Sequence, residues 1–162
     1  MPRYLGWFCL SLTVIAFDYV TKLAVLGSLA PGETRALAPF FNLVLVFNKG
    51  AAFSLLAAAQ GWQTLLFALI AVVASAIISF LIVRNQGKSL FCGALALILG
   101  GALGNLYDRL VYGQVVDFLD FHAAGWHWPA FNVADSAITL GAAILIVESF
   151  LQRPGGGEKG GP

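Results

Sequence analysis

Four long apolar segments constrain the fold of this chain more than any other feature of its sequence. A bilayer core about 30 Å thick is crossed by about 20 apolar residues in a helix. Four segments reach this length: 4–26, 64–83, 89–107 and 133–151. Each is too long and too uniformly apolar for an amphipathic surface helix of a soluble domain. The sequence therefore predicts a mainly α integral membrane protein with four transmembrane helices.

The composition agrees with this fold class. Charged residues make up 10% of the chain and apolar residues 59%, whereas a soluble domain has about 25% charged residues. The net charge of +1 provides no basic patch for phosphates, so nucleic acid is not an expected partner. We expect one four-span domain over residues 1–153. Residues 154–162 lack the apolar side chains needed to fold and are expected to form a disordered cytoplasmic tail.

Basic residues predict the orientation of the spans. They lie at three places that four spans would bring to one side: Arg3, then Arg84 and Lys88, then Arg153 and Lys159. Lysine and arginine are enriched in cytoplasmic loops, so both termini are expected in the cytoplasm. Three basic residues on the other side make the bias modest: Arg35, Lys49 and Arg109.

The two outer segments have patterns of their own. Residues 40–48, "FFNLVLVFN", are β-branched and aromatic and predict a strand or short hairpin at the membrane surface. "NKGAAFS" (48–54) follows; by itself it indicates a turn in which small residues allow close backbone approach. Residues 108–132 predict a second loop or short helix. Its "GWHWP" is rich in tryptophan, which favours the lipid–water boundary.

Asp18 and Lys22 interrupt the first apolar segment. Arg3 and "SLA" near residue 30 resemble parts of a cleaved signal peptide, but the length and the two charges favour a retained span. The i, i+4 spacing places both charges on one helix face, where they can pair. Two interpretations remain open: an ion pair that orients the helix, or the lining of a polar pocket.

"GGALGNLYDR" (100–109) ends the third span. Gly100 and Gly104 form a small-xxx-small face suited to close helix packing. A second, more polar stripe contains Gly101, Asn105 and Asp108, and Arg109 follows it near the interface. Packing alone does not require this concentration of polar groups within one turn.

Asp117 and Asp135 are the candidate reactive pair. Asp117 lies between apolar residues, and Asp135 lies at the start of the fourth span, where a carboxylate also stabilises a helix N-terminus. Acidic groups at membrane depth are functional candidates, and a folded loop can bring these two together. At about 4 Å and an effective dielectric constant of about 20, two carboxylates repel by roughly 4 kcal/mol. The pair therefore shares one proton, and can activate water and donate a proton without a metal.

His122 and His127 offer a metal alternative, but in a loop their spacing is not specific. Cys9 and Cys92 lie within apolar runs and have no metal-ligand spacing. We therefore expect no metal and no cofactor. Asp120 lies three residues after Asp117, and in an extended stretch its side chain would face away from it.

Five motifs in this order resemble lipoprotein signal peptidase, also called signal peptidase II, a family of bacterial membrane aspartic peptidases. The resemblance covers residues 5–150. The motifs are "DYVTK" (18–22), "NKGAAFS" (48–54), "GGALGNLYDR" (100–109), "VVDF" (115–118) and "FNVADS" (131–136). Tyr19 departs from the family, which usually has glutamine there. The departure leaves Asp18 and Lys22 in register, so it puts only local packing in doubt.

The resemblance implies roles for particular residues. Asp117 and Asp135 match the catalytic pair. The positions that line or support the site are Asp18, Lys22, Asn48, Gly50, Gly101, Asn105, Arg109 and Asn132. Family members remove the signal peptide of prolipoproteins just before a cysteine that carries diacylglycerol, and globomycin blocks them. They act in the bacterial cytoplasmic (inner) membrane, with the site on the extracytoplasmic side and membrane lipid around them. Nothing in the sequence requires more than a monomer.

Two other functions compete with this one. A small proton- or ion-coupled transporter could use Asp18 and Lys22 along a path, but no continuous polar relay is visible. A structural subunit could use "GGALG" to bind a partner helix, but this leaves the two aspartates and Asn105 unexplained. The peptidase is the hypothesis that accounts for all of these residues.

Overall fold

The computed structural model describes residues 2–50 and 62–151. Its four helices are α1 (Arg3–Leu26), α2 (Trp62–Arg84), α3 (Ser89–Tyr112) and α4 (Val133–Leu151). All four are long and apolar enough to cross a membrane. The predicted four-span helical fold is confirmed. Residues 51–54 of the "NKGAAFS" motif and the expected tail at 154–162 lie outside the described residues.

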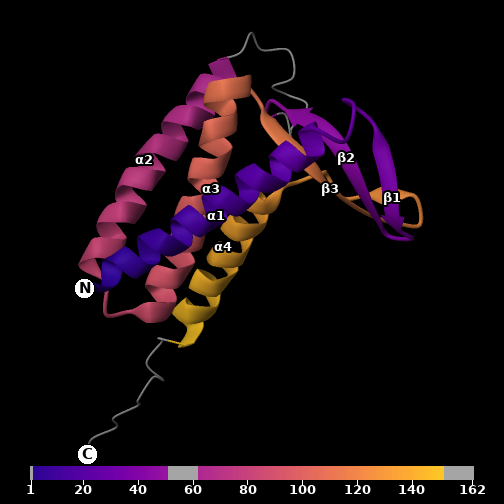
Figure 1. Ribbon diagram of the computed structural model, residues 1–162. Helices are drawn as coiled ribbons and strands as arrows, with labels where there is room; N and C mark the ends of the chain where they lie inside the picture. The colour runs from indigo at the N-terminus through magenta and orange to yellow at the C-terminus, as the bar shows by residue number, and fades with distance from the viewer. Residues whose placement is uncertain (1, 51–61, 152–162) are drawn as a thin grey trace, which may run out of the picture.

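Helix α3 is the centre of the bundle and packs against α1, α2 and α4. The start of α1, the α2–α3 connection and the end of α4 lie at one end of the bundle, and the sheet lies at the other (Figure 1). Helix α2 is apolar all round and exposes large side chains such as Leu65, Leu69 and Phe80. A helix with no polar face suits contact with lipid.

Glycines of α3 allow α1 and α4 to pack closely against it. A Cβ at Gly100 would lie 2.7 Å from the Val14 Cβ of α1, and one at Gly104 would lie 2.7 Å from Asp18 Oδ2. A Cβ at Gly101 would collide with the Ala134 carbonyl oxygen of α4. The expected Gly100–Gly104 packing face is therefore present, and it meets α1, while Gly101 lies on a second face against α4.

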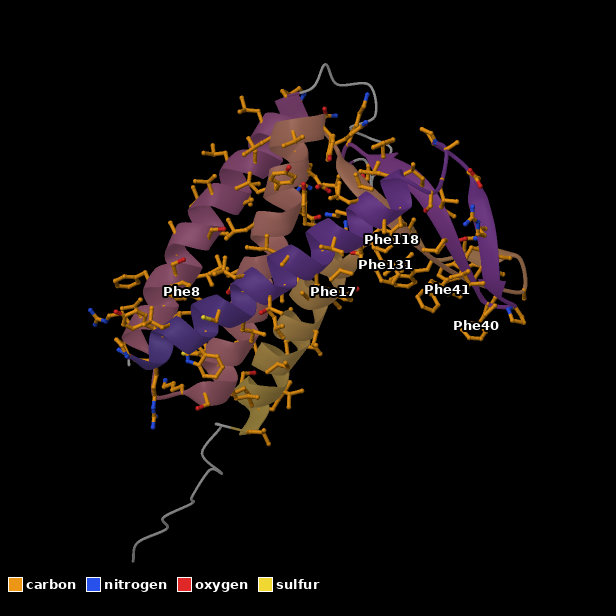
Figure 2. The ribbon with its side chains drawn as sticks, viewed as in Figure 1. Phe8, Phe17, Phe40, Phe41, Phe118 and Phe131 are labelled. Atoms are coloured by element: carbon orange, nitrogen blue, oxygen red, sulfur yellow. The ribbon has the colours of Figure 1, made fainter. Side chains whose placement is uncertain are left out.

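An antiparallel sheet lies at the far end of the bundle, with the strand order β1 (Thr34–Ala38), β2 (Phe41–Asn48), β3 (Val115–Ala123) and β4 (Trp126–His127). The predicted strand at 40–48 is confirmed as β2. Five buried side chains join the sheet to the C-terminal end of α1: Val25, Leu29, Leu45, Val116 and Phe118. Aromatic side chains, among them Phe40, Phe41 and Phe131, lie beneath the sheet beside the bundle (Figure 2).

Two boundaries differ from the sequence-based expectation. Helix α3 continues to Tyr112, five residues past the end of the apolar segment, and stops at Gly113, whose φ of 71° is left-handed. Residues 108–132 contain no helix beyond the end of α3; instead they form β3 and β4. β3 pairs with β2, so that Asp117 lies opposite Val46 and Asp120 opposite Asn42.

Candidate active site

Asp117 is held at the inner end of the sheet by two amides. Asn48 Nδ2 donates to Asp117 Oδ2 at 2.9 Å, and Asn132 Nδ2 donates to Asp117 Oδ1 at 2.7 Å. Asp117 is 2% exposed. Asn48 reaches it because β2 and β3 are neighbours, so a strand pairing between distant parts of the chain builds this half of the site.

Asp135 is held by the same amide group that holds Asp117. The Asp135 backbone N–H donates to Asn132 Oδ1 at 2.8 Å, and the Asn132 backbone N–H donates to Asp135 Oδ2 at 3.3 Å. Asn132 thus caps the first turn of α4 while its amide nitrogen contacts Asp117. Asp117 and Asp135 are therefore both hydrogen-bonded to the same residue, Asn132.

Asn105 connects this pair to the charged residues of the bundle. Its amide nitrogen donates to Asp135 Oδ1 at 2.7 Å. Its carbonyl oxygen accepts from Lys22 Nζ at 3.2 Å and from Asn132 Nδ2 at 3.2 Å. Since an ammonium can only donate, Lys22 fixes the Asn105 carbonyl toward itself and the amide nitrogen toward Asp135.

Lys22 lies between two carboxylates. Its Nζ is 2.7 Å from Asp18 Oδ2 and 2.7 Å from Asp108 Oδ2, and all three side chains are buried. Asp18 Oδ1 accepts from the Ala134 backbone N–H at 2.9 Å, and Asp108 Oδ2 accepts from the Val116 backbone N–H at 3.0 Å. The Asp18–Lys22 ion pair is therefore also a connector, since it links α1, α3, α4 and β3.

The other predicted supporting residues shape the surroundings. Gly50 has φ of +87°, donates its N–H to Asn48 Oδ1 at 2.8 Å, and has no room for a Cβ beside the Phe67 ring. The Arg109 guanidinium lies 5.4 Å from the centre of the same ring, and its Nη1 donates to the backbone carbonyl oxygen of Asn105 at 3.1 Å. Gly50 and Arg109 thus both lie against the Phe67 ring of α2.

Asp108 is the supporting residue that sequence reasoning did not select. It lies on the polar stripe of α3 with Gly101 and Asn105, which was the available signal. Without the fold, nothing indicated that Lys22 would contact Asp108 as well as Asp18. Tyr19 packs edge-to-face on Tyr107, with ring centres 5.4 Å apart, so its departure from the family changes a contact between α1 and α3.

Asp120 belongs to a separate network on the outer part of β3. Its Oδ2 accepts from Asn42 Nδ2 at 2.8 Å, and His127 Nδ1 lies 2.9 Å from its Oδ1. Burial opposes ionisation, but the hydrogen bonds from Asn42 and His127 hold the pKa of Asp120 below its ordinary value. The His127 ring stacks on His122 with centres 4.9 Å apart. Within residues 2–50 and 62–151, no three His, Cys, Asp or Glu side chains are grouped to bind a metal.

Burial and a like charge act together on Asp117. Burial is the largest influence and raises its pKa to about 7, with a further upward contribution from the charge of Asp135. The hydrogen bonds from Asn48 and Asn132 and the charge of Lys22 act in the opposite direction. A carboxyl group with this pKa can hold or release a proton near neutral pH, as general acid–base chemistry requires.

Comparison with known proteins identifies the family. A family model described as signal peptidase (SPase) II matches residues 10–151. The chain belongs to the signal peptidase II family. A protein of Paraburkholderia phymatum named lipoprotein signal peptidase is 56% identical over 142 residues, which cover 88% of this chain and 86% of the relative. A Burkholderia mallei protein of the same name has the same identity and coverage.

Two solved structures, each described as a bacterial membrane enzyme, share the fold of this signal peptidase II. The TM-scores are 0.82 and 0.81, and the sequence identity is 28% in both cases. The matches cover 97% and 92% of this chain and 94% of each solved chain. The protein is therefore a multi-pass membrane peptidase, and the transporter alternative is not supported.

Replacing Gly101 with alanine is expected to disturb the start of α4. The new Cβ would meet the Ala134 carbonyl oxygen, and overpacking of this kind costs about 1–3 kcal/mol. We expect a lower midpoint of thermal unfolding in detergent and reduced peptidase activity, because Ala134 adjoins Asp135. Gly6→Ala is the control, since nothing lies within 4 Å of an added Cβ there. If Gly101→Ala and Gly6→Ala had the same unfolding midpoint and the same activity, close packing at Gly101 would be contradicted.

Proposed function

We propose that this signal peptidase II is an aspartic endopeptidase that removes the signal peptide from diacylglyceryl-modified prolipoproteins, just before the lipidated cysteine. The observation that supports the proposal most is the bridging of Asp117 and Asp135 by the single side chain of Asn132. This side chain binds the carboxyl group of Asp117 and the backbone N–H of Asp135, while the Asn132 backbone N–H and Asn105 Nδ2 donate to the Asp135 carboxyl group. The names of the relatives support the substrate class.

The proposed mechanism uses one proton shared by the aspartate pair. Burial favours Asp117 as its carrier, and in this proposal Asp135 deprotonates the attacking water. As the water oxygen bonds to the scissile carbonyl carbon, Asp117 protonates the carbonyl oxygen. The tetrahedral species then collapses: the C–N bond breaks, the leaving nitrogen takes the proton from Asp135, and Asp117 recovers its own. The pair ends as it began, as general acid–base catalysis requires.

A groove along α4 offers a place for the apolar signal peptide. We call it the flank groove; its volume is about 520 Å³, and Trp128 and Phe131 line it together with α4. The α4 residues that line it follow one face of the helix away from the pair: Asp135, Ser136, Thr139, Leu140 and Ala143. A signal peptide helix lying there would present its end to Asp135.

The proposed location is the bacterial cytoplasmic membrane, with the aspartate pair on the extracytoplasmic side. Arg3, Arg84 and Lys88 belong to the end of the bundle opposite the sheet. Enrichment of basic residues on the cytoplasmic side supports this orientation.

A gel-shift assay tests the proposed substrate. The purified protein in detergent or liposomes is incubated with a diacylglyceryl-modified precursor and, separately, with the same precursor lacking the lipid. We expect only the lipidated form to be shortened, and globomycin to prevent the change. Equal cleavage of both forms would contradict the lipid requirement, and cleavage of neither would contradict the proposed function.

The reaction is expected to slow above neutral pH. The pair needs one proton, and Asp117, with a pKa of about 7, releases it as the pH rises through that value. The kcat/KM for the lipidated precursor should therefore decline by about tenfold per pH unit once the proton is lost. A pH–rate profile from pH 5 to 9 measures this. A rate that keeps rising to the alkaline end would contradict a protonated carboxyl group in the mechanism.

A further inference from the structure

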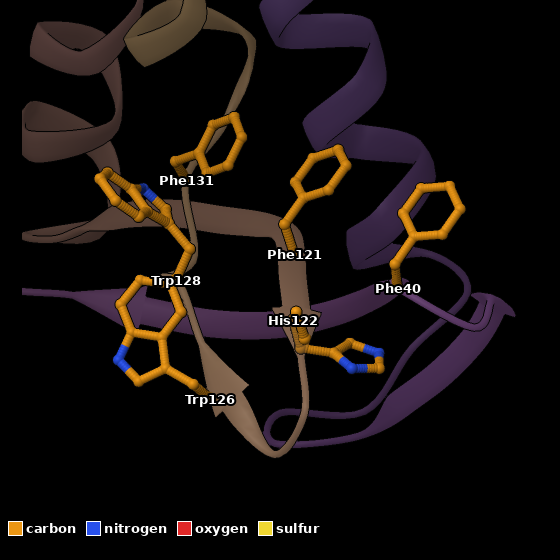
Figure 3. Close-up of a pocket in the computed structure, with 7 residues that line it drawn as sticks. Phe40, Phe121, His122, Trp126, Trp128 and Phe131 are labelled. Carbon is orange, nitrogen blue, oxygen red and sulfur yellow. The ribbon is translucent and has the colours of Figure 1, made fainter.

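An aromatic hollow lies beneath the outer part of the sheet, beside the flank groove. We define it by six rings that line it: Phe40, Phe121, His122, Trp126, Trp128 and Phe131. Its volume is about 400 Å³. The rings of Phe131, Phe121 and Phe40 stand in a row, with Trp126 and Trp128 at one side (Figure 3). The acid–base steps proposed above use none of these side chains, and only Trp128 and Phe131 also line the flank groove.

The hollow is continuous with the candidate active site. Trp128 and Phe131 line both the hollow and the flank groove, and the flank groove also contains Asp135. Phe131 is followed directly by Asn132, the residue bonded to both aspartates. The Phe131 backbone is held against β3, since its N–H donates to the Leu119 carbonyl oxygen at 3.1 Å. A ligand in the hollow would therefore lie next to a peptide bond at the aspartate pair.

The lining favours a neutral, apolar occupant. The rings of Phe40, Trp126 and Trp128 are more than half exposed, at 58%, 62% and 56%. Aromatic cages can also bind quaternary ammonium groups, but no carboxylate lines this one. The nearby Asp120 is bonded to Asn42 and His127 instead. A hydrocarbon chain would bury the exposed rings with no charge to neutralise, and burial of apolar area is favourable.

We propose that the aromatic hollow binds an acyl chain of the diacylglyceryl group carried by the substrate. The proposal rests on the proposed function, which supplies the lipidated cysteine immediately after the scissile bond. The flank groove takes the part of the substrate before that bond. The hollow lies beyond Trp128 and Phe131, so the two parts of the substrate lie in two connected spaces. The acyl chain then determines recognition of the lipidated precursor, and the aspartate pair performs the reaction.

Chain-length dependence tests the proposal. Precursors carrying either two hexadecanoyl or two octanoyl chains are compared in the same detergent with the wild type, Trp126→Ala and Phe40→Ala. We expect each substitution to raise the KM for the hexadecanoyl precursor by about tenfold through lost apolar contact. The kcat should stay unchanged, and the KM for the octanoyl precursor should change by less than about twofold, because a short chain buries less surface. The control is Phe17→Ala on α1, since Phe17 is 60% exposed, as Phe40 is 58%.

The outcomes separate the two proposals. If the wild type cleaves lipidated precursor and the substitutions leave KM unchanged, or lower kcat equally for both chain lengths, the hollow does not bind the chain. If the wild type cleaves no lipidated precursor, the proposed function fails and this inference fails with it. If Phe17→Ala raised the KM for the hexadecanoyl precursor as much as Trp126→Ala and Phe40→Ala do, the assignment of the chain to the hollow would also be overturned.

Bromine quenching of tryptophan fluorescence distinguishes substrate from bulk lipid. Brominated acyl chains quench an indole in contact with them, so a precursor with brominated chains is added to the Asp117→Asn protein in unbrominated liposomes. We expect quenching that is reduced in the Trp126→Phe version of the same protein, and that excess unbrominated precursor reverses. If brominated phospholipid quenches the same signal and unbrominated precursor does not relieve it, bulk lipid occupies the hollow and the proposal is overturned.

Discussion

Asp117→Asn and Asp135→Asn are each expected to lower the turnover of lipidated precursor by about 10³-fold or more, because each removes one acid–base partner. An asparagine can neither deliver nor accept the proton that moves between the pair and the substrate. Both variants should remain folded, since an amide has nearly the same shape. Each keeps one of the two hydrogen bonds that the carboxylate accepts and loses the other, because the amide nitrogen can only donate and would face a second donor. Single-turnover cleavage of the precursor measures the loss, and thermal unfolding in detergent measures the fold.

Asp120→Asn is the matched control for these two variants. Asp120 lies on the same strand as Asp117 and is equally an acidic residue with little exposure, but its partners are Asn42 and His127. At saturating substrate its turnover should stay within about threefold of the wild type, because it contacts neither aspartate of the pair. Wild-type turnover in Asp117→Asn or Asp135→Asn would rule out the aspartate mechanism.

The transmembrane helices could be predicted from the sequence because hydropathy reports directly on contact with lipid. Hydropathy predicted the wrong C-terminal end for α3. Apolar character stops near Tyr107, whereas helical hydrogen bonding continues through Asp108 and Arg109 until the left-handed Gly113. Asp108 has a buried partner in Lys22, so a polar residue there does not end the helix.

Strand β3 could not be predicted because its burial does not alternate. Val115, Val116, Asp117 and Phe118 are all buried, so the period-two pattern of a half-buried strand is absent. What makes this segment a strand is its pairing with β2, which lies far away along the chain. The strand at 40–48 was predictable because its own residues are β-branched and aromatic and are bounded by turn residues.

The aspartate pair was predictable because charged groups at membrane depth are costly and therefore rare. The way the pair is supported was not predictable. The ion pair considered for Asp18 and Lys22 is present, and Lys22 also donates to Asn105, which in turn donates to Asp135. That arrangement depends on Asp108, and only the folded bundle places Asp108 on the other side of Lys22.

Lys22→Met is expected to lower the free energy of unfolding by about 3–5 kcal/mol, since removal of one partner leaves buried charge uncompensated. Lys22 is 2% exposed, and its ammonium is the shared partner of two carboxylates that are as deeply buried. Natural proteins are stable by only about 5–15 kcal/mol, so this loss would be a large share of the total stability. Activity should fall as well, because Asn105 loses the donor that orients it toward Asp135.

Two further variants show whether buried charge is the cause. Lys22→Met combined with Asp18→Asn and Asp108→Asn removes all three charges and should recover most of the lost stability. Arg35→Met removes a cation whose only ion-pair partner among the described residues, Glu33, is exposed and 3.6 Å away; this change should cost less than about 1 kcal/mol. Thermal unfolding in one detergent compares all three proteins. If Lys22→Met were as stable as Arg35→Met, or if the neutral triple variant were no more stable than Lys22→Met, uncompensated charge would not explain the role of Lys22.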